Sequence, residues 1–226
     1  MLVAFCVPSL VGLNKMYVEA MEKSIPLLHA KGYKDIFIQE IGCPYISHAR
    51  SKMLRKAMDR GADIVVFTDY DLSWKPTDLL DLVESAGDVV AGIYRFKKDE
   101  TEYMGTVKSD ENGFPIVKDG ALLSDRVPAG FLKLTKHAVN KFMKEYPELL
   151  YGDPINYSVD LFNHGVIDGV WYGEDYAFSR RWTEKCGDIK ILPDLDICHW
   201  KIDFAGKKDP IPFEGNYHKF LLNCPK

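Results

Sequence analysis

The most constraining feature of the sequence is a series of four largely apolar segments in its first half, separated by amphipathic stretches. The segments are "LVAFCVP", "DIFIQEI", "DIVVFTD" and "DVVAGIYRF". Each has the length of a strand and carries apolar residues at neighbouring positions, so that both faces of the strand are apolar. Strands of this kind are typical of a parallel sheet covered by helices on both sides. The first half therefore predicts an α/β fold with a mixed, mainly parallel central sheet flanked by helices.

The stretches between these segments predict the flanking helices. Asn14, Ser47 and Thr77 each stand at the start of an amphipathic stretch and are good residues for capping a helix N-terminus. Pro26 lies inside the first stretch and predicts a kink or an early end there.

The second half is richer in loops. "SDENG", between "EYMGTVK" and "FPIVKDG", is a turn signal and predicts a small antiparallel hairpin. "RVPAGFLKLT" predicts a further strand, with Thr135 capping the helix that follows. A helix is expected to begin near "GEDYAFSRRW", and "IKILPDLDICHW" predicts a last strand.

Composition excludes several classes of protein. The chain has 226 residues, of which 46% are apolar, and a formal charge of −4 without a basic stripe, so nucleic acid is not expected as a partner. No window approaches the roughly 18 apolar residues of a membrane span, and the N-terminal residues lack the basic region of a signal peptide. The five cysteines are scattered without a CxxC pair, as expected of reduced thiols. Together these features predict a cytoplasmic protein.

Two carboxylates follow the third apolar segment, in "IVVFTDYDLSW". If the strand stays extended there, Asp69 and Asp71 share one side of it. They also stand at the carboxyl end of a parallel strand, where open α/β sheets bind ligands. Two carboxylates packed together repel each other, and a divalent cation relieves that repulsion, with Mg²⁺ or Mn²⁺ suited to oxygen ligands. The alternative is a pair of solvated residues in an ordinary turn.

The order of motifs resembles a known family. "VVFTDYDLSW", preceded by "ISHARSKMLRKAMDRGAD" and followed by "GEDYAFSRRW", is similar to the nucleotide-sugar-dependent glycosyltransferases of the GT-A fold, over roughly the first 200 residues. The resemblance implies one Rossmann-like GT-A domain over residues 1–226. Its nucleotide-binding half would be about 1–105, its acceptor-binding and catalytic half about 106–200, and its tail or lid 201–226. The size and style of the chain suggest an enzyme of a large DNA virus such as a chlorovirus.

The resemblance also implies a donor and metal site. The cofactor would be Mn²⁺ (or Mg²⁺), and the donor a nucleotide-diphosphate sugar, with a UDP-sugar favoured. The implied metal ligands are Asp69, Asp71 and His199, the last in "LDICHWK". The implied donor-binding residues are Pro8, Ser9, Leu10, Arg50, Asp69, Tyr70, Asp71 and Lys201.

The "GED" motif implies the catalytic residues. Transfer with inversion needs a base that takes the proton from the acceptor hydroxyl. The resemblance gives this role to Asp175 and gives Glu174 the orientation of the acceptor, although the two roles are exchangeable. Trp171 and Tyr172, with Glu174, would bind a glycan or glycoprotein acceptor, one sugar face stacking on the aromatic rings.

Two other functions stay open from the sequence. A haloacid-dehalogenase-like phosphatase would use Asp69 as its nucleophile, but "DYDLS" has Ser73 one place late for that pattern, and the motif follows the third strand instead of the first. A non-catalytic module on a glycosyltransferase scaffold would bind a sugar nucleotide or glycan without turnover.

Overall fold

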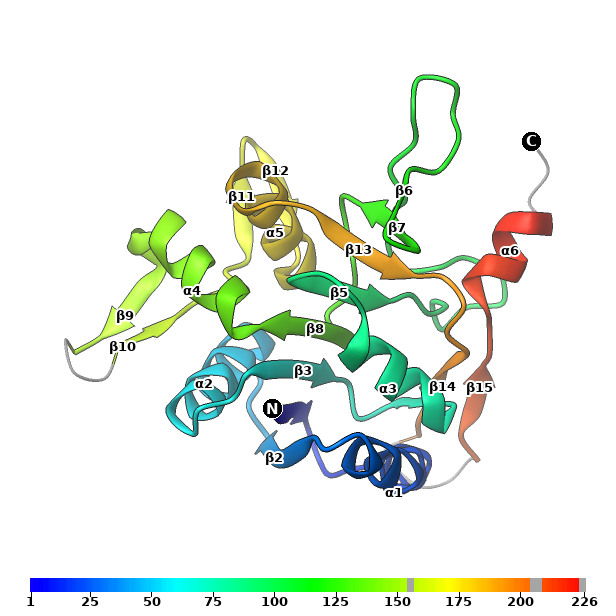
Figure 1. Cartoon of the computed structure of the whole chain (residues 1–226), viewed down its shortest axis with the longest axis horizontal. Helices are drawn as coiled ribbons and strands as arrows, with labels where there is room; N and C mark the ends of the chain where they lie inside the picture. Colours follow the sequence, from blue (N-terminus) through cyan, green and yellow to red (C-terminus); the bar gives the residue numbers. More distant parts are fainter. Residues whose placement is uncertain (154–156, 204–208, 224–226) are drawn as a thin grey trace.

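The computed structural model of the chain describes residues 1–153, 157–203 and 209–223 (Figure 1). The expected tail or lid, 201–226, therefore lies partly outside the described residues.

An eight-stranded sheet forms the centre of the fold, in the order β2-β1-β3-β8-β5-β13-β7-β6. Its strands are β1 (Leu2–Ser9), β2 (Lys34–Ile41), β3 (Ile64–Thr68), β5 (Val89–Gly92), β6 (Val117–Lys118), β7 (Ala121–Ser124), β8 (Phe131–Thr135) and β13 (Ile189–Leu192). β1 pairs in parallel with β2 and β3, and β5 with β13, whereas β8 runs antiparallel between β3 and β5. The expected fold class, α/β with a mixed and mainly parallel sheet, is confirmed.

The apolar strands are covered on both faces, as their composition predicts. In β1, Val3, Phe5 and Val7 belong to one buried cluster, while Ala4 and Cys6 belong to the other. Because successive side chains of a strand point to opposite faces, β1 contributes to two cores, one on each side of the sheet.

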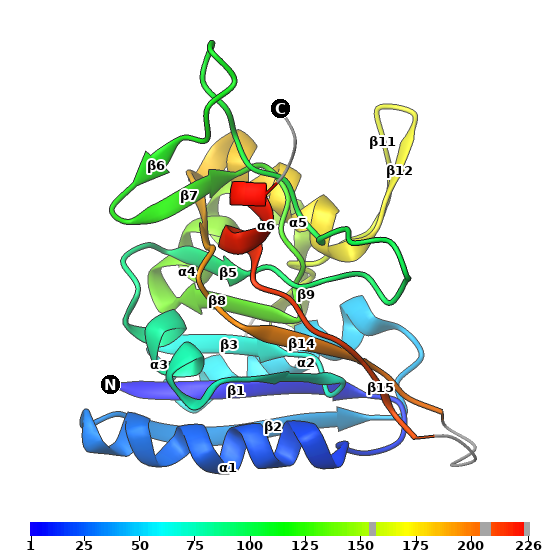
Figure 2. The same cartoon turned by 90° about the vertical axis from the view of Figure 1, so that its right-hand side faces the viewer.

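Each core is closed by its own helices. The helices α1 (Lys15–Ala30) and α3 (Pro76–Glu84) cover one face, where they pack with Val3, Phe5 and Val7. The helices α2 (Ile46–Asp59), α4 (Lys136–Glu145) and α5 (Glu174–Arg181) cover the other face. Figures 1 and 2 show these two helical layers on either side of the sheet. A short π-helix, η2 (Trp182–Cys186), continues α5, and α6 (Tyr217–Asn223) lies near the C-terminus.

Two of the expected helix caps are confirmed and two are wrong. The Asn14 side chain accepts from Tyr17 N at 2.7 Å, and Thr135 Oγ1 accepts from Ala138 N at 3.1 Å. The Ser47 expectation is wrong because α2 begins one residue earlier, at Ile46.

The first turn of α3 is closed by a residue other than Thr77. The helix begins at Pro76, and Asp78 Oδ2 accepts from the backbone N–H of Lys75 at 3.1 Å and of Asp196 at 3.0 Å. The buried carboxylate of Asp78 therefore fixes α3 to the segment before the last strands. In α1, Pro26 is accommodated inside the helix and does not end it.

The second half departs from the expected elements in two places. The small antiparallel hairpin is β6–β7, which turns at Asp119 and Gly120, while "SDENG" forms a separate turn bridged by Ser109 and Pro115. The expected last strand is two strands, because the segment Pro193–Asp196 interrupts it. Its first part is β13, and its second part, β14 (Ile197–Lys201), joins another sheet.

That other sheet places the late histidine beside the Asp69–Asp71 segment. It has the order β15-β14-β4, with β4 (Leu72–Trp74) directly after Asp71 and β15 (Ile211–Phe213) following β14. In the antiparallel register of β14 and β4, His199 lies opposite Leu72. Two further hairpins are β9–β10 (Leu150–Gly152, Tyr157–Val159), which follows the 3-10 helix η1 (Pro147–Leu149), and β11–β12 (Gly165–Ile167, Val170–Tyr172).

Two expectations from composition concern cysteines and membrane spans. Cys6, Cys43, Cys186 and Cys198 are free thiols, as expected, and Cys224 lies outside the described residues. Among the helices that the structure describes, none combines the length and the apolarity that a membrane crossing requires.

Candidate active site

The two aspartates after β3 lie in a turn and not in an extended strand. β3 ends at Thr68, and Leu72 N donates to Asp69 O at 3.1 Å. The strand is therefore not extended at these residues, so strand alternation does not determine where the Asp69 and Asp71 side chains point. The turn instead gives each carboxylate its own set of neighbours.

Asp69 faces the interior. Its backbone N–H donates to Gly130 O at 2.8 Å, and its Oδ1 accepts from Arg50 Nη2 at 2.9 Å. A Cβ atom at Gly130 would collide with both Asp69 Oδ2 and the hydroxyl of Tyr94, so all three groups crowd one point. Burial raises the pKa of Asp69 above its usual range, against the opposing pull of the Arg50 guanidinium.

Arg50 joins the two acidic motifs. Besides Asp69, its guanidinium binds Glu174, with Nη1 donating to Oε1 at 2.6 Å. The side chain is only 2% exposed, and the guanidinium lies 5.4 Å from the centre of the Phe162 ring. Asp69 and Glu174, 105 residues apart in the chain, are thus held on one cation from α2.

Asp71 faces a second cationic group. Its Oδ2 is in contact with Lys97 Nζ and lies 3.7 Å from His199 Nε2. Burial alone would raise the pKa of Asp71, but hydrogen bonding and charge from His199 and Lys97 outweigh it and hold the pKa below its usual range. His199 Nδ1 is 2.8 Å from the carbonyl oxygen of Arg95, so Nδ1 carries a proton and donates to that oxygen, while Nε2 faces Asp71.

The side chains around Asp71 fit a divalent cation only in part. Within the described ranges, no group of three or more His, Cys, Asp or Glu side chains is arranged to hold a metal ion. The expected trio of ligands is therefore not assembled, because Asp69 turns to Arg50. Asp71 and His199 remain as a pair, with Nδ1–H of the histidine bonded to a carbonyl, which is the usual arrangement of a metal-binding imidazole. This pair supplies only two ligands, so water in the free protein, or a bound substrate, would have to supply the rest.

Asp175 stands beside this network at the N-terminus of α5. Its Oδ1 accepts from Tyr176 N at 2.8 Å. Burial, reinforced by the neighbouring charge of Glu174, raises the pKa of Asp175 to about 6. A carboxylate with this pKa is ionised at neutral pH and is a better proton acceptor than an ordinary aspartate.

The expected acceptor residues lie on the β11–β12 hairpin, which stands away from the main sheet (Figure 2). Trp171 is 66% exposed, and its ring centre is 5.9 Å from that of His164. Tyr172 is anchored instead, because its hydroxyl accepts from Arg180 Nη1 at 2.9 Å. The hairpin leads directly into Gly173, Glu174 and Asp175, so the exposed indole and the carboxylates belong to one continuous segment.

A cavity of about 270 Å³ adjoins the two aspartates. It is lined by Pro8, Ser9, Leu10, Glu40, Cys43, Pro44, Ile46, Ala49, Asp69, Tyr70 and Asp71. Six of the eight residues expected to bind the donor therefore meet around one cavity. The other two differ: Arg50 is buried behind Asp69, and Lys201, the last residue of β14, is exposed and does not line the cavity. The donor-binding role of all eight stays a prediction.

Four residues of the site were not predicted from the sequence. Arg95 is the second-last residue of the fourth apolar segment, and Lys97 follows that segment directly. Tyr94 and Gly130 lie in segments identified only as strands. The signal that was available is "PAGF", since a glycine in a buried strand indicates a close approach of another group.

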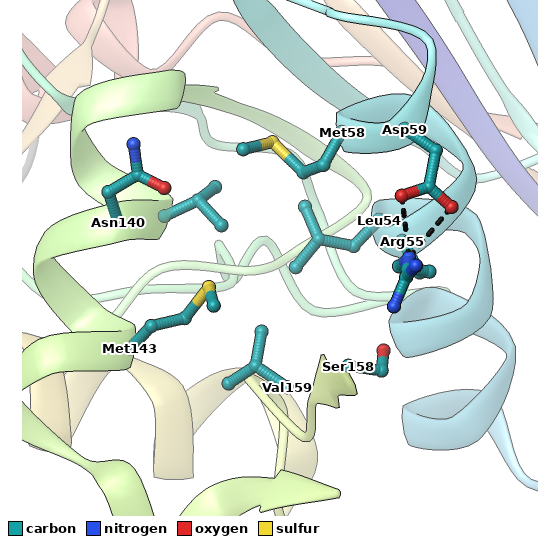
Figure 3. Close-up of a pocket in the computed structure, with 9 residues that line it drawn as sticks. Leu54, Arg55, Met58, Asp59, Asn140, Met143, Ser158 and Val159 are labelled. Carbon is teal, nitrogen blue, oxygen red and sulfur yellow. Dashed lines mark hydrogen bonds and ion pairs between the residues drawn. The ribbon is translucent and has the colours of Figure 1, made fainter. Parts of the chain in front are cut away.

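A second cavity, of about 260 Å³, lies away from these residues, between α2, α4 and β10. Figure 3 shows Leu54, Met58, Met143 and Val159 converging on it, with Arg55 and Asp59 paired at its edge. The cavity shares no residue with the groups around Asp69 and Asp71, and its lining is mostly apolar.

Comparisons with known proteins give distant likenesses only. No family model and no curated protein matches the chain. Among solved structures, the catalytic domain of Drosophila beta1,4galactosyltransferase 7 is 11% identical, with a TM-score of 0.45 over 84% of this chain and 64% of that one. GalNAc-T7, solved with UDP, GalNAc and Mn²⁺, is 11% identical, with a TM-score of 0.44 over 87% of this chain and 43% of that one. S. aureus TarS 1-349 is 12% identical, with a TM-score of 0.46 over 85% and 58%.

The chain thus spans between two fifths and two thirds of the length of these structures. Scores and identities this low establish neither a shared function nor membership of a family. The chain's chemistry has to be argued from its own side chains, and the expected viral origin stays a prediction.

Proposed function

We propose that the protein is a metal-dependent glycosyltransferase of the hexosyltransferase type, which moves a sugar from a nucleotide-diphosphate sugar to an acceptor hydroxyl of a glycan with inversion. The observation that carries this proposal is the Arg50 bridge. It holds Asp69, on the rim of the cavity, and Glu174, on the segment with the exposed Trp171, against one buried guanidinium. A donor side and an acceptor side are therefore joined by 2.6 and 2.9 Å contacts.

The donor side suits a nucleotide. The cavity of about 270 Å³ has an apolar wall from the end of β1 and an acidic rim at Asp69 and Asp71. We assign the nucleoside to the wall and the diphosphate to the rim. Asp71 and His199 would hold Mn²⁺ or Mg²⁺, which, when bound, neutralises the negative charge that develops on the departing diphosphate. A UDP-sugar remains the favoured donor.

The acceptor side suits proton transfer. Asp175 takes the proton from the acceptor hydroxyl, whose oxygen forms the new bond to the anomeric carbon. The bond from that carbon to the diphosphate oxygen breaks, and the nucleoside diphosphate leaves with the electron pair. A single base on the side opposite the leaving group gives inversion. Glu174, fixed by Arg50, orients the acceptor, and Trp171 offers an exposed aromatic face to a sugar ring.

The phosphatase alternative finds little support in this geometry. A nucleophilic Asp69 needs a free oxygen facing the substrate, yet Oδ1 is bonded to Arg50 and Oδ2 is crowded by Tyr94 and Gly130. A non-catalytic binding module is compatible with the same cavity, so the test must detect turnover.

The proposal is tested by incubating the protein and Mn²⁺ with a panel of UDP-, GDP-, CMP- and dTDP-sugars and mixed oligosaccharide acceptors. Mass spectrometry would follow the release of free nucleotide and the gain of one sugar. We expect transfer from one donor that is lost on chelation of the metal and in Asp175→Asn. Binding of a donor without transfer would favour the non-catalytic module. A trapped aspartyl-phosphate would favour the phosphatase.

A further inference from the structure

Two nitrogen groups converge on a single oxygen of Asp71. Lys97 Nζ contacts Oδ2, and His199 Nε2 faces the same atom from 3.7 Å. The Asp71 side chain is only 14% exposed, so few other directions of approach remain. A divalent ion that bound both Oδ2 and Nε2 would stand next to the Lys97 ammonium.

The segment that carries Lys97 is held in shape by contacts among its own residues. We call residues 95–103 the Lys97 loop, since Arg95 and Tyr103 form the bridge that closes it. Inside it, Phe96 N donates to Glu102 O at 3.0 Å. The Arg95 guanidinium donates to the carbonyls of Lys98, Asp99 and Glu100 at 3.3–3.5 Å, and thereby holds the loop in shape.

Arg95 contacts both neighbours of Asp71, the Lys97 loop and His199. Its side chain shapes the Lys97 loop, and its carbonyl oxygen accepts from His199 Nδ1 at 2.8 Å. The guanidinium is also tied to the C-terminal segment, 3.5 Å from Glu214 O and 5.9 Å from the centre of the Phe213 ring. None of these contacts involves Asp71. The contacts that shape the loop therefore do not depend on the ion pair between Lys97 and Asp71.

We propose that Lys97 is an internal cation that competes with the divalent metal for Asp71. Without metal, the ammonium neutralises the carboxylate and occupies the space beside His199. Metal binding requires the ammonium to leave, because the two like charges would repel each other at this distance. The metal affinity of the protein is consequently set by Lys97 as well as by the ligands. This inference rests on the metal site of the proposed function, but not on glycosyl transfer.

The test measures Mn²⁺ binding directly, by the electron paramagnetic resonance signal of free Mn²⁺, on the full chain without any substrate. Lys97→Met and Lys97→Gln both remove the competing charge. Lys98→Met is the matched control, because Lys98 is next in the same loop and pairs with Glu102 instead. Asp71→Asn removes the shared ligand. Circular dichroism of each variant checks that it is folded.

We expect both Lys97 variants to bind Mn²⁺ about tenfold more tightly than the wild type, which corresponds to the repulsion relieved. Lys98→Met should bind as the wild type does, and adding Asp71→Asn to Lys97→Met should abolish the gain. Unchanged or weaker binding in both Lys97 variants, with binding still lost in Asp71→Asn, would overturn the competition and leave the metal site standing. Absence of Mn²⁺ binding in every protein, the Lys97 variants included, would overturn both.

Discussion

At the residue scale, the site depends on a few side chains whose charges are balanced one against another. Arg50 pairs with Asp69 and Glu174, and Lys97 pairs with Asp71, whereas Asp175, whose pKa is raised to about 6, has no ion pair of this kind among the described residues. This arrangement suits a site in which one carboxylate accepts a proton while the others bind cations and fix the geometry.

The raised pKa of Asp175 predicts a pH-dependent cost in stability. Because its pKa is about 6 in the folded protein and near 3.8 ordinarily, the folded state binds more protons between these values. The free energy of unfolding therefore falls as pH rises from about 4 to 6, and stays lower above that. Asp175→Asn, which keeps the oxygen that accepts from Tyr176 N, should be more stable than the wild type by about 1–3 kcal/mol at pH 7.5. Urea unfolding at pH 7.5 and pH 4 measures this, and a gain that persists unchanged at pH 4 would contradict it.

The same residue predicts the pH dependence of activity. If Asp175 is the base, the rate constant kcat should fall about tenfold per pH unit below pH 6, as the carboxylate becomes protonated. Asp175→Asn should lower kcat by about 10²–10⁴ at pH 7.5. A pH–rate profile of the wild type with its identified donor checks both. A rate independent of pH between 5 and 7 would exclude Asp175 from this role.

Arg50 is predicted to be the residue on which the assembly most depends. Arg50→Met would leave two largely buried carboxylates without their cation and should lower the free energy of unfolding by about 3 kcal/mol. Arg55→Met is a suitable control, since Arg55 lies on the same helix and pairs with Asp59 at i,i+4, where the loss should be below about 1 kcal/mol. Chemical denaturation would measure the free energy of unfolding of both variants. Equal losses would mean that the Arg50 bridge contributes no more to stability than the Arg55–Asp59 pair does.

At the scale of elements, β8 and the β11–β12 hairpin position the residues of the site. β8 passes between β3 and β5, and at its start Gly130 lets Asp69 and Tyr94 approach the backbone. The hairpin carries Trp171 and runs into α5, whose first turn holds Glu174 and Asp175.

Gly130 offers a test of this close packing. Gly130→Ala places a methyl group against Asp69 Oδ2 and the Tyr94 hydroxyl and should destabilise the fold by about 1–3 kcal/mol. Adding Tyr94→Phe removes one of the two clashes and should recover part of the loss. Gly12→Ala, where a Cβ meets nothing within 4 Å, is the control. Thermal unfolding of the three variants is sufficient, and a Gly130→Ala protein as stable as the control would refute the packing described.

Trp171, on the β11–β12 hairpin, is expected to contribute to acceptor binding but little to stability. Trp171→Ala removes an indole that is 66% exposed, so the melting temperature should change little. If the indole stacks on the acceptor, KM for the acceptor should rise while KM for the donor stays the same. Steady-state kinetics with each substrate varied in turn would show this, and an unchanged acceptor KM would remove Trp171 from the acceptor site.

At the scale of the whole molecule, the sheet and the meeting of the two acidic motifs are predictable from the sequence, but their details are not. The sheet and its two helical layers are predictable because a strand that is buried on both faces is apolar at successive positions. The helices that cover it are amphipathic. The turn at Asp69–Asp71 is not visible in that pattern, because the Asp69 N–H donates to Gly130 O, which is distant in sequence and lies just before β8. The cap expected at Thr77 failed for a similar reason, since Asp78 closes the turn of α3 while bonding to Asp196 N, whereas Ser47 failed because α2 begins one residue earlier. Lys97 carries no local signal at all, and only the folded Lys97 loop brings it to Asp71.

The central claim is that the cavity beside Asp71 binds a nucleoside diphosphate together with a divalent cation, and the most direct test is ligand-dependent unfolding. The melting temperatures of the wild type and of Asp71→Asn would be measured with UDP, GDP, CDP and dTDP, each with and without Mn²⁺. A ligand at a hundred times its Kd stabilises the fold by about 2.7 kcal/mol, which is easily detected. We predict a shift for one nucleotide, UDP first, that requires both Mn²⁺ and Asp71. Melting temperatures unmoved by all four nucleotides, with or without Mn²⁺, would contradict the claim.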